Sequence, residues 1–254
     1  MNVAVCIKRV PLSPGRWSLT PDATAIDTSG SAMGWTLSPH EECATEAAVQ
    51  LIEADGGEVT AFSLGTADST EQIRELMAVG VSRGVLLETG ADEWDPQATA
   101  AALASAIRDD ATTYDMVIVG TESADTSGYQ VGVRIAHALG WPIVTNVKGL
   151  SVTGGVARCE RVVGTDREVY EVSLPAVIAV KDGVNIPRYP SVPGRIKARK
   201  KPIDTVAPTA SPARLEKIRL ALPPQETGTA TVLGTGPEAA PRVVEVLKEI
   251  GVLT

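Results

Sequence analysis

The chain has 254 residues, 44% of them hydrophobic, and a formal net charge of -8 at pH 7. This length permits one large domain, or a domain with an appended arm, built on a sizeable core, and the acidic balance excludes a nucleic-acid-binding protein that relies on a basic surface. Three widely spaced cysteines, two histidines and apolar runs too short to span a membrane argue against disulfide-rich, zinc-binding and membrane-inserted classes, so we expect a soluble, cytoplasmic protein.

Strands and helices alternate through the first half of the chain. Apolar runs predict buried strands at residues 3–7, 59–64, 85–87 and 116–119. The spacing of apolar residues between them predicts helices that open at Ser38, Asp68 and Asp95. At the first of these, Ser38 is a good N-cap, Pro39 suits the first helical position and Glu41 completes a capping box. The alternation predicts an α/β, Rossmann-like fold, with a mostly parallel sheet and helices on both faces.

One loop of this pattern has the residues of an anion site. It runs from Gly120 to Gly132, between the strand at 116–119 and a helix predicted over 131–139. Backbone N–H groups at a helix N-terminus favour an anion, and hydroxyls that add donors stand on Thr121, Ser123, Thr126 and Ser127. The alternative is an ordinary surface loop. No Lys follows the glycines and the G-x-G-x-x-G spacing is absent, so the loop is neither a P-loop nor a dinucleotide fingerprint.

Three strand ends carry groups that could bind a ligand. They are Cys6–Arg9, Leu64–Asp68 and Gly120–Tyr129. Because ligands of open α/β sheets bind beyond the carboxyl ends of the strands, we expect these three loops to converge. Lys8 and Arg9 would then face an anionic ligand, although two solvated charges at a strand end explain the pair equally well.

After Gly140 the pattern changes. Runs rich in β-forming residues at 142–150, 156–163 and 167–173 are separated by glycine turns and predict an antiparallel hairpin element. Residues 176–180 are again a buried apolar strand. Residues 11–34, in contrast, are irregular and leave room for a short hairpin.

The last quarter of the chain shows weaker patterns. Residues 181–201 have no apolar periodicity and carry a basic cluster, in which Val192 is a candidate for a projecting apolar contact. A solvated loop is the alternative, and on these residues alone it is the favoured one. Residues 202–229 are rich in Pro, Ala and Thr, which indicates an arm or linker. An amphipathic helix is predicted over 237–250, and it must bury its apolar face on its own domain or on another subunit.

Several segments carry motifs of one known family, in the family's order. They are Val-Ala-Val-Cys-Ile-Lys-Arg-Val at 3–10, the helix start at 38–42, the loop at 120–132, Leu-Pro-Ala-Val at 174–177, and the segment from Asn185 to Pro202. In the loop, Gly120, Asp125, Gln130 and Gly132 keep places in the family pattern Gly-Lys-Gln-Ala-x-Asp-x-x-x-x-Gln-x-Gly. The ordered set resembles the β subunit of electron-transfer flavoproteins (ETF), including the related FixA proteins.

The resemblance implies a heterodimer with an α subunit that holds a redox-active FAD, and a second nucleotide, AMP, in this chain. It implies flavin dehydrogenases as electron donors, such as acyl-CoA dehydrogenases, with the ETF-quinone oxidoreductase as a further candidate partner. Residues 1–201 would form the nucleotide-binding α/β domain, and residues 202–254 an arm and helix that contact the partner subunit. No catalytic residue is implied, because the chain would be an electron-carrier subunit.

The resemblance also assigns residues by position. The implied nucleotide site comprises Cys6, Ser38, Pro39, His40, Glu41, Leu64, Gly120, Thr121, Glu122, Ser123, Ala124, Asp125, Thr126, Ser127, Gly128, Tyr129, Gln130 and Val131. The implied docking loop comprises Arg188, Tyr189, Val192, Pro193, Arg195 and Lys197. Val192 stands where relatives place an apolar anchor, and such anchors dominate the affinity of many interfaces.

The chain departs from the family pattern in this site. Thr121 and Glu122 replace Lys-Gln, which removes one positive charge, while Ser38 and His40 replace an Asn and an aromatic residue. These changes leave the nucleotide open between AMP and, as in electron-bifurcating relatives, a second FAD. Two other classes stay open. One is a hydrolase-type protein of the ATP-pyrophosphatase or stress-protein fold, against which the lack of a Gly-rich turn after the first strand speaks. The other is an assembly scaffold with an empty nucleotide site.

Overall fold

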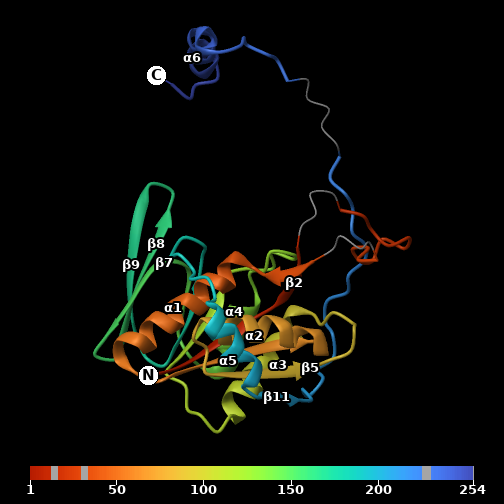
Figure 1. The fold of residues 1–254 in the computed structure, drawn as a ribbon, viewed down its shortest axis with the longest axis vertical. Coiled ribbons are helices and arrows are strands. Elements are labelled where there is room, and N and C mark those ends of the chain that lie inside the picture. Colours follow the sequence, from red (N-terminus) through yellow and green to blue (C-terminus); the bar gives the residue numbers. More distant parts are fainter. Residues whose placement is uncertain (13–16, 30–33, 225–229, 254) are drawn as a thin grey trace. The chain divides into compact units, whose positions relative to one another are not determined.

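The structure, a computed structural model, describes residues 1–12, 17–29, 34–224 and 230–253. The chain divides into two compact units, Met1–Arg219 and Leu220–Thr254, and Figure 1 labels several of their helices and strands. Within the described residues, none of the helices has the length and apolar content that crossing a membrane requires.

The described part of the first unit is built on a nine-stranded sheet with the order β11-β5-β4-β1-β6-β10-β7-β8-β9. Its strands are β1 (Asn2–Ile7), β4 (Glu58–Gly65), β5 (Arg83–Glu88), β6 (Met116–Gly120), β7 (Ile143–Thr153), β8 (Val156–Val163), β9 (Asp166–Ser173), β10 (Ala176–Val180) and β11 (Ile203–Val206). Pairing is parallel from β11 to β7 and antiparallel from β7 to β9. This confirms the predicted mostly parallel sheet with a late antiparallel element.

Helices pack on both faces of this sheet, as predicted. They are α1 (Pro39–Asp55), α2 (Thr70–Val79), α3 (Pro96–Asp109), α4 (Val131–Leu139) and α5 (Val192–Lys200). Alternate residues of β1 divide the core, because side chains of a strand point in turn to the two faces of a sheet. Val3 and Val5 pack in a cluster with residues of α1 and α2, whereas Ala4 packs in a second cluster with residues of α3 and α4. The two helix pairs therefore cover opposite faces.

A two-stranded antiparallel sheet stands at the borders of the irregular segment. It pairs β2 (Arg9–Pro11) with β3 (Trp35–Leu37), and the Arg9 guanidinium carbon lies 4.1 Å from the centroid of a Trp35 ring, a favourable cation–π contact. Between these strands, Leu19 and Ile26 form an isolated antiparallel bridge, so a short hairpin is present there. Residues 13–16 and 30–33 of the segment lie outside the described residues.

Two helix starts differ from the prediction. A short 3-10 turn, η1 (Ala67–Ser69), precedes α2, so Asp68 lies inside that turn and is not the N-cap. Ser38 stands at the N-cap of α1, but its hydroxyl caps no backbone N–H in the described chain and instead donates to Glu122 O over 3.5 Å. The predicted capping box is therefore wrong in its Ser38 half. The carboxyl group of Glu41, its other half, accepts the backbone N–H of Lys8, just after β1, at 2.9 Å.

The segment predicted as an irregular basic loop contains helix α5. The Ser191 hydroxyl caps it by accepting the Gly194 N–H at 3.1 Å, and Ala198 is buried on a helix that packs on α2. Arg74 of α2 donates to carbonyls at the end of the helix, Ala198 O at 3.0 Å and Lys201 O at 3.1 Å. The helix is held by the Arg74 hydrogen bonds and by the burial of Ala198, not by a stripe of apolar residues. Its sequence therefore shows no apolar periodicity.

The predicted arm begins inside the sheet. Ile203–Val206 forms β11, which pairs in parallel with β5, and Arg83 of β5 forms an ion pair with Asp204 at 2.7 Å. The second unit contains a 3-10 turn, η2 (Pro237–Ala239), and the predicted helix, α6 (Ala240–Glu249). Within the described residues of that unit, no side chain of α6 is buried, so its apolar face is uncovered there.

Candidate nucleotide-binding site

The three strand ends predicted to carry ligand-binding groups meet. β1 pairs in parallel with β4 on one side and with β6 on the other, so the carboxyl ends of these strands share one edge of the sheet. The ammonium group of Lys8 lies 2.6 Å from Asp125 Oδ2, which joins the loops after β1 and β6. Arg9 Nη2 lies 3.9 Å from Asp68 Oδ2, on the loop after β4. The predicted convergence is confirmed.

Gly120 brings the loop after β6 against the start of α1. A Cβ atom at this position would stand 3.0 Å from the Cβ of His40 and 3.1 Å from the Cγ of Glu41. A side chain there would crowd His40 and Glu41, so glycine favours the close approach of the two segments. Ser38 reaches the same loop through its hydrogen bond to Glu122. The residues predicted from α1 and from the loop are therefore brought together.

Cys6 and Leu64 supply apolar atoms at the strand ends. Burial, with a smaller contribution from Glu41, raises the pKa of the Cys6 thiol to about 12, so Cys6 is neutral and acts as a small apolar group. Leu64 is partly buried and packs on the core cluster beneath α3 and α4. These two residues can shape a ligand site but bring no charge to it.

The loop before α4 turns through two left-handed residues that are not glycine. They are Ser127, with φ 45°, and Tyr129, with φ 55°, and such conformations are uncommon for these residue types. The hydroxyls of Ser123 and Thr126 are hydrogen-bonded to each other at 2.7 Å. Helix α4 begins directly after the loop, at Val131, so unpaired backbone N–H groups stand where an anion is favoured.

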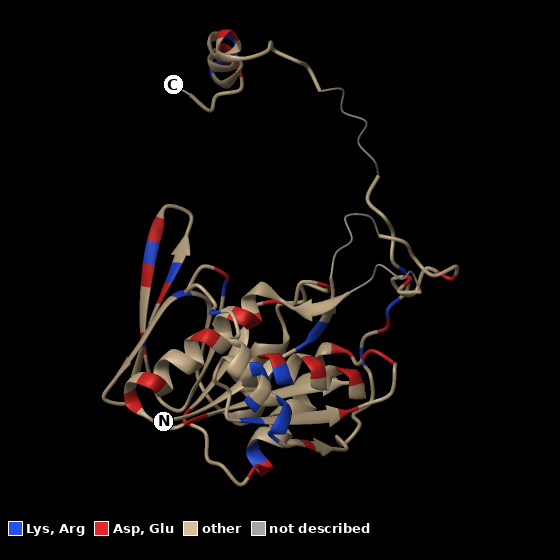
Figure 2. Cartoon of the chain, in the orientation of Figure 1, with Lys and Arg blue, Asp and Glu red and all other residues tan. Residues whose placement is uncertain are grey.

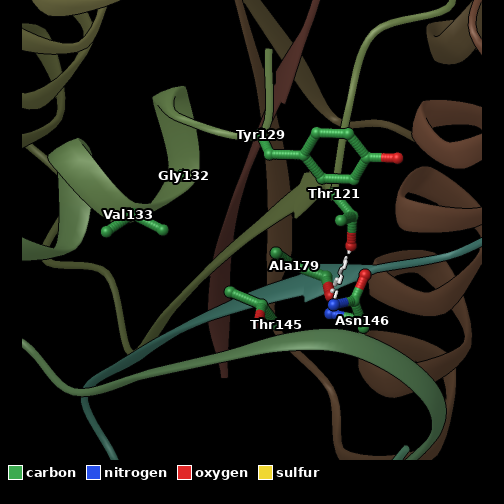
Figure 3. Close-up of a pocket in the computed structure, with 7 residues that line it drawn as sticks. All are labelled: Thr121, Tyr129, Gly132, Val133, Thr145, Asn146 and Ala179. Carbon is green, nitrogen blue, oxygen red and sulfur yellow. Dashed lines mark hydrogen bonds between the residues drawn. The ribbon is translucent and has the colours of Figure 1, made fainter. Parts of the chain in front are cut away.

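Thr121 fastens this loop to the sheet. Its hydroxyl donates to Ala179 O of β10 at 3.0 Å and accepts the N–H of Asn146 of β7 at 3.3 Å, as Figure 3 shows. A pocket of about 140 Å³ lies beside these bonds, lined by Thr121, Tyr129, Gly132, Val133, Thr145, Asn146 and Ala179. The hydroxyl predicted as a free donor is thus engaged within the chain.

Thr145 and Asn146 of β7 were not predicted as site residues. They lie where the pairing of β7 with β10 shifts its register, between Val144 and Val147, and Asn146 has a φ of 57°. This β-bulge places two polar side chains on the pocket beside the candidate loop. In the sequence, only one feature points to this bulge: Asn146 stands inside a run of β-forming residues, and Asn tolerates the left-handed conformation better than most residues.

Lys8 stands in a chain of charges beside the loop. Its ammonium group contacts Asp125 at 2.6 Å and Glu93 at 3.0 Å, and Glu93 also pairs with Lys217 at 2.6 Å. Burial by itself lowers the pKa of Lys8, but the two carboxylates outweigh burial, and the pKa lies above its ordinary value. Lys8 is therefore a permanent cation at the edge where the three loops meet.

Two acidic residues of the site differ in charge. Glu41 is 6% exposed, and burial raises its pKa to about 8, against the lowering effects of the Lys8 N–H and the Lys8 charge. It is largely protonated at neutral pH. Hydrogen bonds from Tyr129 and Ser127 lower the pKa of Glu122, so this residue is an anion within the candidate loop.

His40 has a ring nitrogen that a bound ligand could contact. Its Nδ1 atom is buried and has no hydrogen-bond partner among the described residues, while its Nε2 atom lies 3.4 Å from Asp182 Oδ1. A buried polar atom without a partner costs free energy, so this nitrogen is free to bond a water, a ligand or a group of another chain. The close approach at Gly120 and the cation at Lys8 suit a phosphate-bearing nucleotide at the same edge.

The predicted docking residues divide into two kinds. Tyr189 and Val192 are 95% and 71% exposed. The predicted residues Pro193, Arg195 and Lys197 of α5 are also exposed, and several Lys and Arg positions colour this helix blue in Figure 2. Arg188 is instead engaged within the chain, because its guanidinium group pairs with Glu46 and Glu53 of α1 at 2.8 and 2.6 Å. Arg188 therefore fastens this segment to α1.

Comparison with known proteins gives a consistent result. The family model described as "Electron transfer flavoprotein domain" matches residues 25–211. The chain is 32% identical over 251 residues to the electron transfer flavoprotein subunit beta of Syntrophomonas wolfei, covering 98% of this chain and 96% of the relative. It is 32% identical over 224 residues to the Bacillus subtilis subunit beta, covering 84% and 86%. It is 31% identical over 259 residues to the human subunit beta, covering 99% and 98%.

Proposed function

Because the chain belongs to the electron transfer flavoprotein family, as a β subunit, we propose that it is the non-catalytic subunit of a heterodimeric electron carrier. In this role it binds AMP where β4, β1 and β6 end, and its α-subunit partner holds FAD. The FAD supplies the electron-accepting and electron-donating chemistry when it is bound. Residues of the β subunit hold the second nucleotide, help to form the wall of the flavin site and dock the flavin dehydrogenases that donate electrons.

One observation carries the nucleotide assignment, namely the meeting of three loops at one edge of the sheet. The Lys8–Asp125 contact of 2.6 Å ties two of these loops together, and Gly120 lets the start of α1 approach them. The oxygens of a phosphate beside the first turn of α4 would accept hydrogen bonds from backbone N–H groups. The phosphate would also lie near the Lys8 cation. The unpartnered Nδ1 of His40 supports a further group supplied from outside this chain, such as the partner's flavin.

We expect one FAD and one AMP per heterodimer. The measurement is to co-express the chain with its α subunit, denature the purified complex and quantify the released nucleotides by chromatography. Two FAD molecules per complex would replace AMP with a second flavin in this chain and make electron bifurcation its function. A chain that purifies without a second subunit and without nucleotide would contradict the proposal.

The surface around the start of α5 is proposed to dock the dehydrogenase partners. Val192 is 71% exposed at the first position of the helix, and the Ser191 cap and the Arg74 hydrogen bonds hold that helix on the body. An apolar side chain on a fixed support loses little entropy when it enters a partner's pocket. Exposed basic residues along α5 would steer an acidic partner more than they would strengthen the final contact.

Val192→Ala should weaken docking without disturbing the heterodimer. The substitution removes two methyl groups from a contact that becomes buried in the complex with the partner, so the KM for the partner dehydrogenase should rise about tenfold. The measurement is the rate of electron transfer as a function of partner concentration. Val206→Ala is the matched control, since Val206 is also exposed but lies on β11. An unchanged rate at limiting partner concentration would contradict the docking role.

The C-terminal unit is proposed to contact the α subunit. Within its described residues α6 leaves apolar side chains exposed, including Val243 and Val244, and an amphipathic helix needs a surface on which to bury that face. The heterodimer that the family membership implies supplies such a surface. Residues 202–254 then act as an arm toward the partner, although the arm's first residues belong to β11 of the sheet.

A further inference from the structure

Glu41 is buried where three elements of the candidate site meet. Its Cγ atom lies 3.1 Å from the position that a Cβ of Gly120 would take, so it packs against the first residue of the candidate loop. One of its carboxyl oxygens accepts the backbone N–H of Lys8, just after β1, at 2.9 Å. Glu41 is 6% exposed, whereas its neighbour Glu42 on the same helix is exposed.

Among the described residues, Glu41 has no cationic side chain that pairs with it alone. The titratable groups near it are Cys6 at the end of β1, Lys8 just after that strand, Asp125 in the loop after β6 and His40 on its own helix. The Lys8 ammonium group contacts Asp125 and Glu93 at 2.6 and 3.0 Å, so it is engaged by two other carboxylates. Burying a carboxylate without a counter-ion is costly, and this geometry favours the neutral acid.

We propose that Glu41 couples nucleotide binding in this chain to protonation: the site holds a phosphate-bearing ligand while the Glu41 carboxyl group is neutral and loses affinity when it ionises. This inference rests on the proposed nucleotide-binding function. A phosphate in the loop would add negative charge near Asp125 and Glu122, and an ionised Glu41 beneath it would repel that charge with little screening by water. The proton is taken from solvent and held on a Glu41 carboxyl oxygen.

Thermodynamic linkage gives the size of the effect. Glu41 in the free site titrates at about pH 8, so the Kd for AMP should change little below pH 7 and rise about tenfold between pH 7 and pH 9. The phosphate of the ligand does not confuse this window, because the second pKa of a phosphate monoester is about 6. Burial also keeps the Cys6 thiol neutral throughout, with its pKa at about 12.

The experiment is equilibrium dialysis of labelled AMP against the purified heterodimer at pH 7, 8 and 9. The wild-type complex should bind AMP about tenfold more weakly at pH 9 than at pH 7. Glu41→Gln mimics the neutral acid and should bind AMP with the same Kd at all three values. Glu42→Gln removes the same charge from the exposed neighbour and should keep the wild-type dependence.

Infrared spectroscopy adds a measurement that needs no nucleotide. The carbonyl stretch of a protonated, buried carboxylic acid should be present at pH 7 in the wild type and in Glu42→Gln, and lost in Glu41→Gln. Absence of this band, a wild-type Kd that does not change with pH, or an unchanged pH dependence in Glu41→Gln would each overturn the coupling alone. A complex that binds no AMP at any pH would overturn the proposed function together with the coupling.

Discussion

Replacing Arg188 with Ala is expected to lower the free energy of unfolding by about 2 kcal/mol. The Arg188 guanidinium group donates to both oxygens of Glu46, at 2.8 and 2.9 Å, and to both oxygens of Glu53, at 2.6 and 2.9 Å. The Glu46 side chain is only 5% exposed. Without Arg188 its carboxylate keeps hydrogen bonds from the Gln50 amide and from one backbone N–H, but it loses its cation.

The expected loss lies below the roughly 3 to 5 kcal/mol typical of breaking a fully buried pair, because the Arg188 side chain is 36% exposed and water screens part of the interaction. Denaturant titration at fixed concentration of the complex is the measurement. Glu53→Gln, at a side chain that is 55% exposed, should cost less than about 0.5 kcal/mol. Adding Glu46→Gln to Arg188→Ala should recover part of the loss, because no buried charge then lacks its partner. If Arg188→Ala costs no more than Glu53→Gln, the buried pair does not stabilise the fold.

Glu41 should make the folded chain less stable as the pH rises. Its pKa is about 8 in the folded state, above the ordinary value of 4.5, so the unfolded chain releases the proton first. The contribution to stability is fully present below about pH 4.5 and is lost as the pH rises to about 8. Each pH unit within this window costs at most about 1.4 kcal/mol. We therefore expect Glu41→Gln to gain about 2 kcal/mol over the wild type between pH 5 and pH 7.

The measurement is the free energy of unfolding of both proteins across this range, without added nucleotide. Groups that titrate equally in both proteins cancel in the difference between them. Glu42→Gln is the control, since Glu42 is exposed and burial raises its pKa less than it raises that of Glu41, so its difference from the wild type should change less with pH. A difference between Glu41→Gln and the wild type that stays constant from pH 5 to pH 7 would show that Glu41 is not a buried acid in the folded chain.

Helix ends that depend on nearby residues could be predicted from the sequence. Asp95 caps α3 by accepting the Ala98 N–H at 2.7 Å, and Gly140 ends α4 in a left-handed conformation, both as their residue types suggest. Asp68 shows the limit of such reading, because it also resembles a cap but lies inside a 3-10 turn. Local signals give the type of an element more reliably than its first residue.

The candidate site was predictable to the extent that it follows from the order of strands. Parallel strands place their carboxyl ends at one edge, so the meeting of Lys8 with the loop at Gly120–Gly132 could be expected. The bulge that carries Asn146 to the pocket could not, because it arises in the pairing of β7 with β10, a strand that follows two further strands later in the chain. The residues of β7 had no local reason to be assigned to the site.

The sequence by itself determined the α/β alternation, the late antiparallel element and the family, because apolar spacing, turn residues and ordered motifs are properties of short segments. Only the tertiary structure decided which polar groups are free and which are engaged. Arg188 was a candidate contact for a partner until Glu46 and Glu53 were found to hold it, and Glu41 was a capping residue until burial favoured its neutral form. Burial and pairing depend on residues distant in the chain, and a charge in a folded protein is set by what surrounds it.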